Sequence, residues 1–196
     1  MKLRTLALAS LLVCGIASGA TAATTSAAAS SGALPTDSLY HSETHWQDMN
    51  NQSVLLPTLQ GKVQLVAFVY THCVSMCPVI VADLQRVEAM LTDTERQQVH
   101  FTLISLDPER DLPETMLAFM QTHKLDTEHW QFMRGNDDDT RELAMLFNIR
   151  YRQEGEEIVH SNTISVLDGS GRLIHQRLGA GGLDAVMTAI RQQLRH

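Results

Sequence analysis

The sequence predicts an α/β domain of three layers, in which helices flank a central sheet. Two observations support this fold class. Residues 63–70, VQLVAFVY, form a nearly continuous apolar run that is rich in β-branched and aromatic side chains, as in a strand buried on both faces. Strand-like and helix-like patterns then alternate along the chain, which ends in a hairpin and a helix.

The helix that follows the first strand begins near Pro78. From Val79 to Leu91, apolar residues recur at helical spacing, with charged and amide side chains between them. Proline fits the first turn of a helix, where its missing N–H costs no hydrogen bond. We therefore expect Cys73 in the loop between strand and helix, and Cys77 at the helix N-terminus.

The later elements continue the alternation. Three aspartates at residues 137–139 favour the start of a helix, because carboxylates complement the positive end of the helix dipole. The turn sequence Asp168-Gly-Ser-Gly171 separates two short apolar runs that predict a hairpin. We expect strands at residues 99–106 and 130–133, helices at 113–124 and 137–146, hairpin strands at 164–167 and 172–175, and a final helix at 183–194.

The N-terminus resembles an export signal. Residues 1–22 contain Lys2 and Arg4, then an apolar stretch, and end in the small residues that a signal peptidase prefers. A membrane anchor is the alternative, although the apolar stretch is shorter than the roughly 20 residues of a spanning helix. Export predicts the bacterial periplasm, and anchoring predicts the outer face of the inner membrane.

Residues 23–38 have low complexity and lack an apolar face, so we expect a flexible linker before a folded domain at residues 39–196. Removal of the signal would shift the net charge from −7 to −9, because it takes away two cations. So acidic a domain is poorly suited to bind nucleic acid, whose phosphates attract Lys and Arg.

Cys73 and Cys77 are the only cysteines outside the predicted signal. A helix N-terminus stabilises thiolate, the form that attacks disulfides and binds soft metal ions. A purely structural disulfide is disfavoured, because so short a loop gains little from being closed. A redox pair and half of a metal site both remain open.

His160 is the leading candidate for a third ligand. It follows a polar stretch and directly precedes the strand at residues 164–167, and sites in α/β sheets form where loops of neighbouring strands meet. Imidazole beside two thiolates suits copper or zinc. On sequence spacing alone, a surface histidine explains His160 equally well. His72 is expected to be exposed, Met76 to pack rather than to bind metal, and the spacing of His41 and His45 to be coincidental.

The combined motifs resemble the Sco/SenC family. They are Cys73-x-x-x-Cys77-Pro78 after an apolar strand, Ser105-Leu-Asp-Pro-Glu-Arg-Asp111, and His160-Ser161 before a strand. The resemblance covers about residues 40–195. It implies a thioredoxin-like three-layer fold with a central mixed sheet, and one copper ion, Cu(I) or Cu(II), per chain, bound by Cys73, Cys77 and His160.

The resemblance further implies a function in assembling the copper centre of cytochrome c oxidase, by copper delivery or by reduction of its thiols. The partner would be a copper-receiving oxidase subunit or another periplasmic copper or thiol protein, and the chain itself would be a monomer. Many family members carry proline after the first cysteine and an acidic residue before the histidine. This chain has Val74 and Val159 there, which bears on copper affinity and preferred oxidation state.

A thiol–disulfide oxidoreductase that acts on one dedicated partner is the alternative function, with Cys73 and Cys77 as a redox-active pair. A general thioredoxin-type reductase is disfavoured, because the last of the five prolines is Pro113 and none lies near residues 160–164. A thiol peroxidase is excluded, since neither cysteine has the required upstream threonine and proline.

Overall fold

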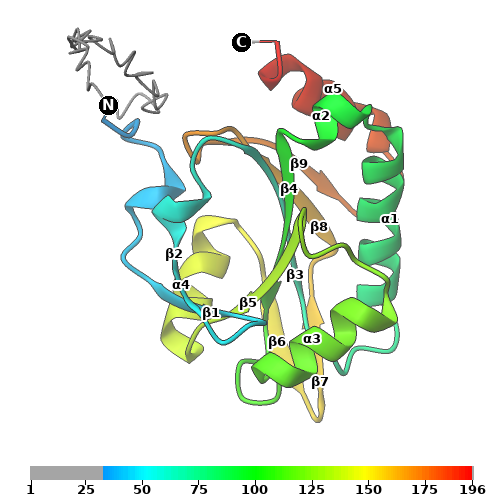
Figure 1. The fold of residues 1–196 in the computed structure, drawn as a ribbon. Coiled ribbons are helices and arrows are strands. Elements are labelled where there is room, and N and C mark those ends of the chain that lie inside the picture. The colour runs from blue at the N-terminus through cyan, green and yellow to red at the C-terminus, as the bar shows by residue number, and fades with distance from the viewer. Residues whose placement is uncertain (1–32, 196) are drawn as a thin grey trace, which may run out of the picture. The chain divides into compact units, whose positions relative to one another are not determined.

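The computed structural model describes residues 33–195. Its central sheet is mixed and has seven strands in the order β2-β1-β5-β4-β3-β8-β9 (Figure 1). The strands are β1 (His45–Asp48), β2 (Ser53–Leu55), β3 (Val63–Val69), β4 (Val99–Ser105), β5 (Trp130–Arg134), β8 (Thr163–Leu167) and β9 (Leu173–Leu178). Strands β6 (Tyr151–Glu154) and β7 (Glu157–His160) form a separate two-stranded sheet.

Strand β3 occupies an inner position of the sheet, and all seven of its residues are buried. It pairs in parallel with β4 on one side, with Val63 opposite Val99, and antiparallel with β8 on the other. An almost wholly apolar sequence is what such a position requires, because helices cover both faces of the strand. The predicted three-layer domain with a mixed sheet is confirmed.

Helices form the two outer layers. Figure 1 shows α1 (Cys77–Met90) beside α5 (Leu183–Gln193), and α4 (Asp137–Leu146) on the opposite side of the sheet. Helix α3 (Pro113–Thr122) adjoins α1 through Gln85, whose amide donates to the carbonyl of His123 at 2.8 Å. On the other face, the ring of Phe68 packs edge-on against Phe147, just beyond α4, with 5.4 Å between centroids.

A buried ion pair fixes α1 against the sheet. The guanidinium of Arg177 in β9 donates to the carboxylate of Asp83 in α1 at 2.9 Å, and both side chains are about 95% buried. An unpaired charge at this depth would be strongly unfavourable, so the pair specifies where the helix lies. Since α1 begins at Cys77, this contact also helps to place the sulfur of that residue.

Several elements differ from the expectation. The sequence patterns did not predict β1, β2, the short helix α2 (Asp93–Arg96), the 3₁₀ turns η1 (Leu39–His41) and η2 (Leu56–Leu59), or the β6–β7 hairpin. These elements are short, and their strands are largely exposed or pair with distant parts of the chain. Local periodicity is weak in such segments.

The predicted signal at residues 1–22 and most of the predicted linker lie outside the described residues. Ser38, the last residue of that linker, is buried and forms a β-bridge with Arg172, so the ordered domain extends at least one residue before residue 39. Within residues 33–195, no helix has the length and hydropathy needed to span a bilayer.

Candidate metal centre

The two cysteines lie where strand, loop and helix meet. Strand β3 ends at Val69, the loop bends back through a hydrogen bond from the Cys73 N–H to the Tyr70 carbonyl at 3.2 Å, and α1 begins at Cys77. Pro78 lies in the first helical turn, as expected. Both cysteines are buried free thiols.

His160 is the last residue of β7 and faces the cysteines. Its Nε2 lies 3.7 Å from the Sγ of Cys77. The ligand atoms of Cys73, Cys77 and His160 all lie within 4.8 Å of one another. Residues 83 positions apart in the chain therefore converge on one point.

This spacing fits a shared metal ion. Nitrogen and sulfur ligands bound to one ion at about 2.0 and 2.3 Å, with about 120° between the bonds, are roughly 3.7 Å apart. The sulfur–nitrogen distance already has this value. Two thiolates and an imidazole form a soft donor set, which suits copper or zinc and is unsuited to Mg²⁺ or Ca²⁺.

The imidazole of His160 has the tautomer that metal binding requires. Its Nδ1 lies 3.2 Å from the carbonyl oxygen of Ser161, which can only accept a hydrogen bond. The proton is therefore on Nδ1, and the lone pair of Nε2 points toward Cys77. Burial lowers the pKa of His160, which keeps the ring neutral near pH 7 and able to bind a metal ion.

The two thiols differ in acidity. Burial alone would raise the pKa of Cys73, but hydrogen bonds from the Cys77 thiol and from the backbone N–H groups of Cys77 and Ser75 outweigh it, so this pKa is lowered. The Cys77 N–H donates to the Cys73 Sγ at 3.3 Å. Burial strongly raises the pKa of Cys77, and its hydrogen bond to Cys73 adds to this effect.

The start of α1 therefore activates the cysteine that precedes it. The dipole argument applied to Cys77, the first helical residue, but complete burial outweighs the dipole there. Cys73 receives the helical N–H instead and is the better nucleophile of the pair.

Two further residues support the cysteine loop. The carboxylate of Asp111 is fully buried and accepts hydrogen bonds from the Thr71 N–H at 3.1 Å, the Thr71 hydroxyl at 2.5 Å and the Ser105 hydroxyl at 2.6 Å. The hydroxyl of Tyr70 donates to Glu157 at 2.6 Å and accepts from the Ile158 N–H at 3.3 Å. Tyr70 thus joins the cysteine loop to the hairpin that carries His160.

Sequence reasoning did not assign a role to Tyr70, the last residue of the apolar run at residues 63–70, or to Asp111, the last residue of the Ser105–Asp111 motif. It also read the stretch before His160 as a polar segment and missed the hairpin. Gly155 between two short β-forming runs was the available signal, and its φ of 66° confirms a turn there.

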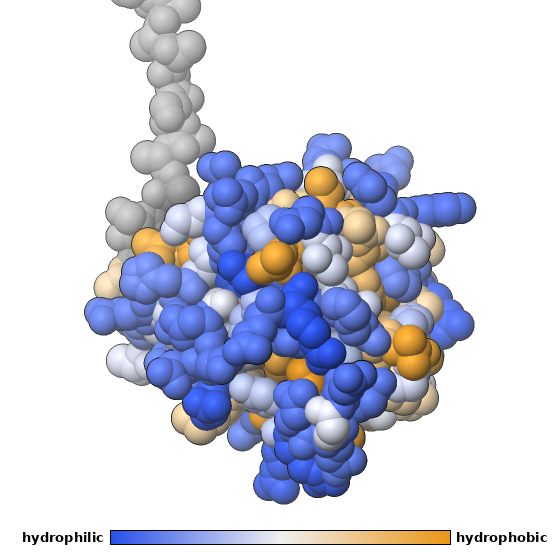
Figure 2. Space-filling model, turned by 90° about the horizontal axis from the view of Figure 1, so that it is seen from below, coloured by the Kyte–Doolittle hydropathy of each residue, from blue (hydrophilic) through white to orange (hydrophobic). Residues whose placement is uncertain are grey.

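Cys73 and His160 line a cleft of about 520 Å³, whose walls include Met76 and Val159, whereas Cys77 lies buried behind them. Figure 2 views this end of the domain and shows small apolar patches among hydrophilic side chains. Val74 is 84% exposed, and Met76, Val79 and Val159 are also exposed. Val74 and Val159 stand where many family members have a proline and an acidic residue. Both valines therefore add exposed apolar surface around the site.

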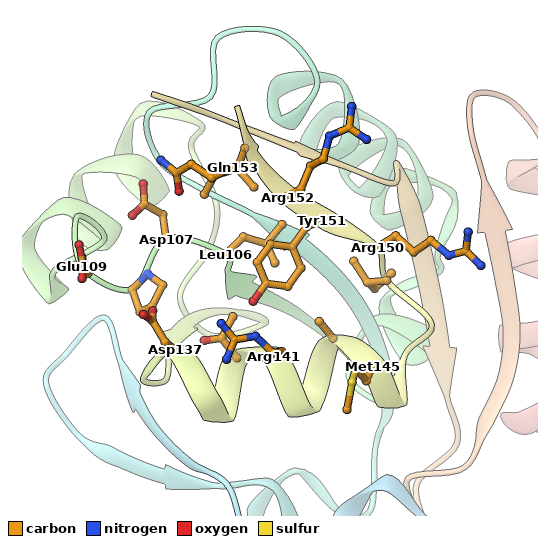
Figure 3. Close-up of a pocket in the computed structure, with 15 residues that line it drawn as sticks. Leu106, Asp107, Glu109, Asp137, Arg141, Met145, Arg150, Tyr151, Arg152 and Gln153 are labelled. Carbon is orange, nitrogen blue, oxygen red and sulfur yellow. The ribbon is translucent and has the colours of Figure 1, made fainter. Parts of the chain in front are cut away.

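A second cleft of about 570 Å³ lies on the other side of the β6–β7 hairpin. In Figure 3, α4 forms one wall with Asp137, Arg141 and Met145, and β6 contributes Tyr151 and Arg152. Neither cysteine lines this cleft, so it is separate from the metal centre.

The other histidines singled out earlier lie outside the donor group. His72 is exposed, as expected, and its Nδ1 contacts the Thr71 hydroxyl at 3.1 Å. His41 contacts the carbonyl of Pro35 at 2.9 Å, and among the described residues neither His41 nor His45 joins a cluster of metal-ligating side chains.

Comparison with known proteins gives matches to one family model and to several relatives. The family model "SCO1/SenC" matches residues 38–195. A "SCO1 protein homolog" of Bacillus subtilis is 26% identical over 133 residues, which are 66% of this chain and 68% of that protein. A "Putative copper-binding protein" of Stutzerimonas stutzeri is 24% identical over 151 residues, covering 73% and 72% of the two chains.

Solved structures share the fold. Copper-bound ScoI of Bradyrhizobium japonicum superimposes with a TM-score of 0.64 at 23% identity, covering 76% of this chain and 96% of that one. BsSco, described as a member of the Sco family of cytochrome c oxidase assembly proteins, gives a TM-score of 0.67 at 23% identity, with coverages of 76% and 90%. The expected thioredoxin-like fold is thereby confirmed. Because the family model spans nearly the whole described domain, this chain belongs to the SCO1/SenC family.

Proposed function

We propose that the chain is an exported, copper-binding metallochaperone and thiol redox protein that assists assembly of the copper centre of cytochrome c oxidase. The convergence of the Cys73, Cys77 and His160 donor atoms within 4.8 Å carries this proposal. Relatives support copper as the cargo, since one is described as a copper-binding protein and one structure holds copper. A copper-receiving oxidase subunit is the proposed partner, because BsSco is assigned to a family of oxidase assembly proteins.

The site's own residues account for both binding and release. The two thiolates and the neutral His160 ring bind one copper ion, which the burial of both cysteines and the partial burial of His160 hold at the edge of the core. When the thiols reduce a disulfide of the partner, two electrons and two protons pass to the partner's cysteines and a Cys73–Cys77 disulfide forms. This oxidation removes both thiolates and thus the cargo site.

A thiol–disulfide oxidoreductase without obligatory metal transfer is the second candidate. The unequal acidity of the cysteines favours it, because a low-pKa Cys73 beside a buried Cys77 suits attack by one thiol and resolution by the other. The sequence has no proline near residues 160–164, which sets this site apart from general thioredoxin-type reductases.

A paired assay distinguishes these functions. The reduced protein is expected to bind one copper ion per chain in a titration against a competing chelator, and the oxidised protein to bind none, because its sulfurs are bonded to each other. In an insulin-reduction assay the same protein is expected to show little turnover. If the reduced protein bound no copper but reduced insulin efficiently, the oxidoreductase function would replace the metallochaperone function.

A further inference from the structure

The β6–β7 hairpin that carries His160 has little packing of its own. It is not part of the central sheet, and Ile158 is its only buried residue. Ile158 also lines both of the clefts described above, one on each side of the hairpin. The hydrophobic core therefore holds the hairpin through Ile158 and the partly buried Tyr151, and the remaining restraint on His160 must come from other contacts.

Polar contacts supply the missing restraint from two directions. Tyr70 binds the β7 strand through the hydrogen bonds to Glu157 and Ile158. Arg110 binds the turn, because its Nη2 donates to the carbonyl of Glu156 at 3.0 Å. The guanidinium is itself oriented by an ion pair with Asp107, through its Nε.

Arg110 is adjacent to Asp111, which holds the other half of the site. The Asp111 carboxylate binds Thr71, two residues before Cys73. Arg110 and Asp111 are consecutive residues of one loop. Arg110 therefore holds the histidine hairpin, and Asp111 holds the cysteine segment. Arg110 itself hydrogen-bonds to the hairpin turn and not to a donor atom, so it acts on the site through position, whereas the charge of Asp111 also helps to raise the pKa of Cys77.

We propose that Arg110 is a positioning residue for His160, setting the distance between the imidazole and the cysteine sulfurs. This inference rests on the proposed copper site. Without the Arg110 contact, the hairpin turn loses its only side-chain hydrogen bond from the loop at residues 107–111 in the described chain. The imidazole then samples positions farther from Cys77, and the metal loses its third ligand for part of the time.

The variant Arg110→Gln tests this proposal. It is expected to weaken copper binding by about tenfold, the size of effect that residues orienting a metal ligand produce. In the copper-free reduced protein, backbone amides of residues 157–160 are expected to exchange with deuterium faster, while those of β3 and β8 keep their rates. Arg172→Gln is the matched control, since it removes an exposed ion pair with Asp37 beyond the end of β8 that is remote from His160.

A double-mutant cycle shows whether Arg110 acts through His160. In a His160→Ala background, Arg110→Gln is expected to have no further effect on copper affinity, because the ligand it positions is gone. Unchanged affinity in Arg110→Gln alone, or an equal loss in both backgrounds, would overturn the inference and leave the copper site standing. If His160→Ala alone bound copper with unchanged affinity, His160 would not be a ligand. Both the proposed copper site and the role of Arg110 would then be wrong.

Discussion

Replacing either cysteine of the pair with alanine is expected to lower copper affinity by more than about 100-fold, beyond the roughly 10–100-fold loss caused by disturbing an outer-shell residue. In the proposed copper site, Cys73 and Cys77 supply the two soft donors, and one sulfur with one imidazole would leave an incomplete coordination shell. His160→Ala is also expected to weaken binding, by a smaller factor, because both thiolates remain.

His72→Ala is the matched control for the histidine variant. It removes an imidazole that adjoins Cys73 in sequence but is exposed and absent from the donor group. Copper affinity is expected to stay at the wild-type value. A competition titration with a chromogenic copper chelator measures the wild type and the four variants under the same conditions, and wild-type affinity in Cys77→Ala would contradict the assigned ligands.

In the reduced, copper-free protein, Cys73 is expected to react with iodoacetamide at least about 100-fold faster than Cys77 at neutral pH, because the thiolate is the reactive species. Hydrogen bonds from the start of α1 lower the pKa of Cys73 below its ordinary value of 9.0, whereas burial raises that of Cys77. Cys77 is also completely buried, which restricts access of the reagent.

The pH dependence of the Cys73 alkylation rate follows from the lowered pKa of this thiol. A lowered pKa means that the Cys73 thiolate persists as the pH falls, so the midpoint of its alkylation rate lies below pH 9.0. Mass spectrometry of digests taken along the time course assigns each modification to its cysteine. Faster modification of Cys77, or a midpoint above that of a free cysteine, would contradict the electrostatics described for the loop.

The central architecture followed directly from sequence patterns. The apolar run of β3 and the helical spacing after Pro78 placed Cys73 in a loop and Cys77 at a helix start, and the structure confirms both positions. Burial on both faces leaves a continuous apolar signal that a single sequence displays. The family motifs then singled out His160, which spacing alone could not separate from a surface histidine.

The hairpin that carries His160 was not predictable in the same way. Seven of its eight strand residues are at least partly accessible, so its strands lack the apolar alternation of a half-buried sheet. Its position depends on Tyr70 and Arg110, which are distant in sequence. Only the folded chain brings those side chains to the hairpin.

The acidity of the cysteines likewise required the structure. Sequence placed Cys77 at the positive end of a helix, where thiolate is stabilised, but did not rank the two thiols. Its burial raises the pKa of Cys77, and the direction of its N–H toward the Cys73 sulfur makes Cys73 the more acidic thiol. A desolvation effect of this kind depends on how closely the surrounding core packs, which no local motif reports.

X-ray absorption at the copper edge of the Cu(I)-loaded protein tests the central claim most directly. The structure predicts scattering from two sulfur ligands and one imidazole nitrogen, with the imidazole contribution lost in His160→Ala and retained in His72→Ala. A copper ion bound only by nitrogen and oxygen, or a spectrum that is identical in wild type and His160→Ala, would contradict a site built from Cys73, Cys77 and His160.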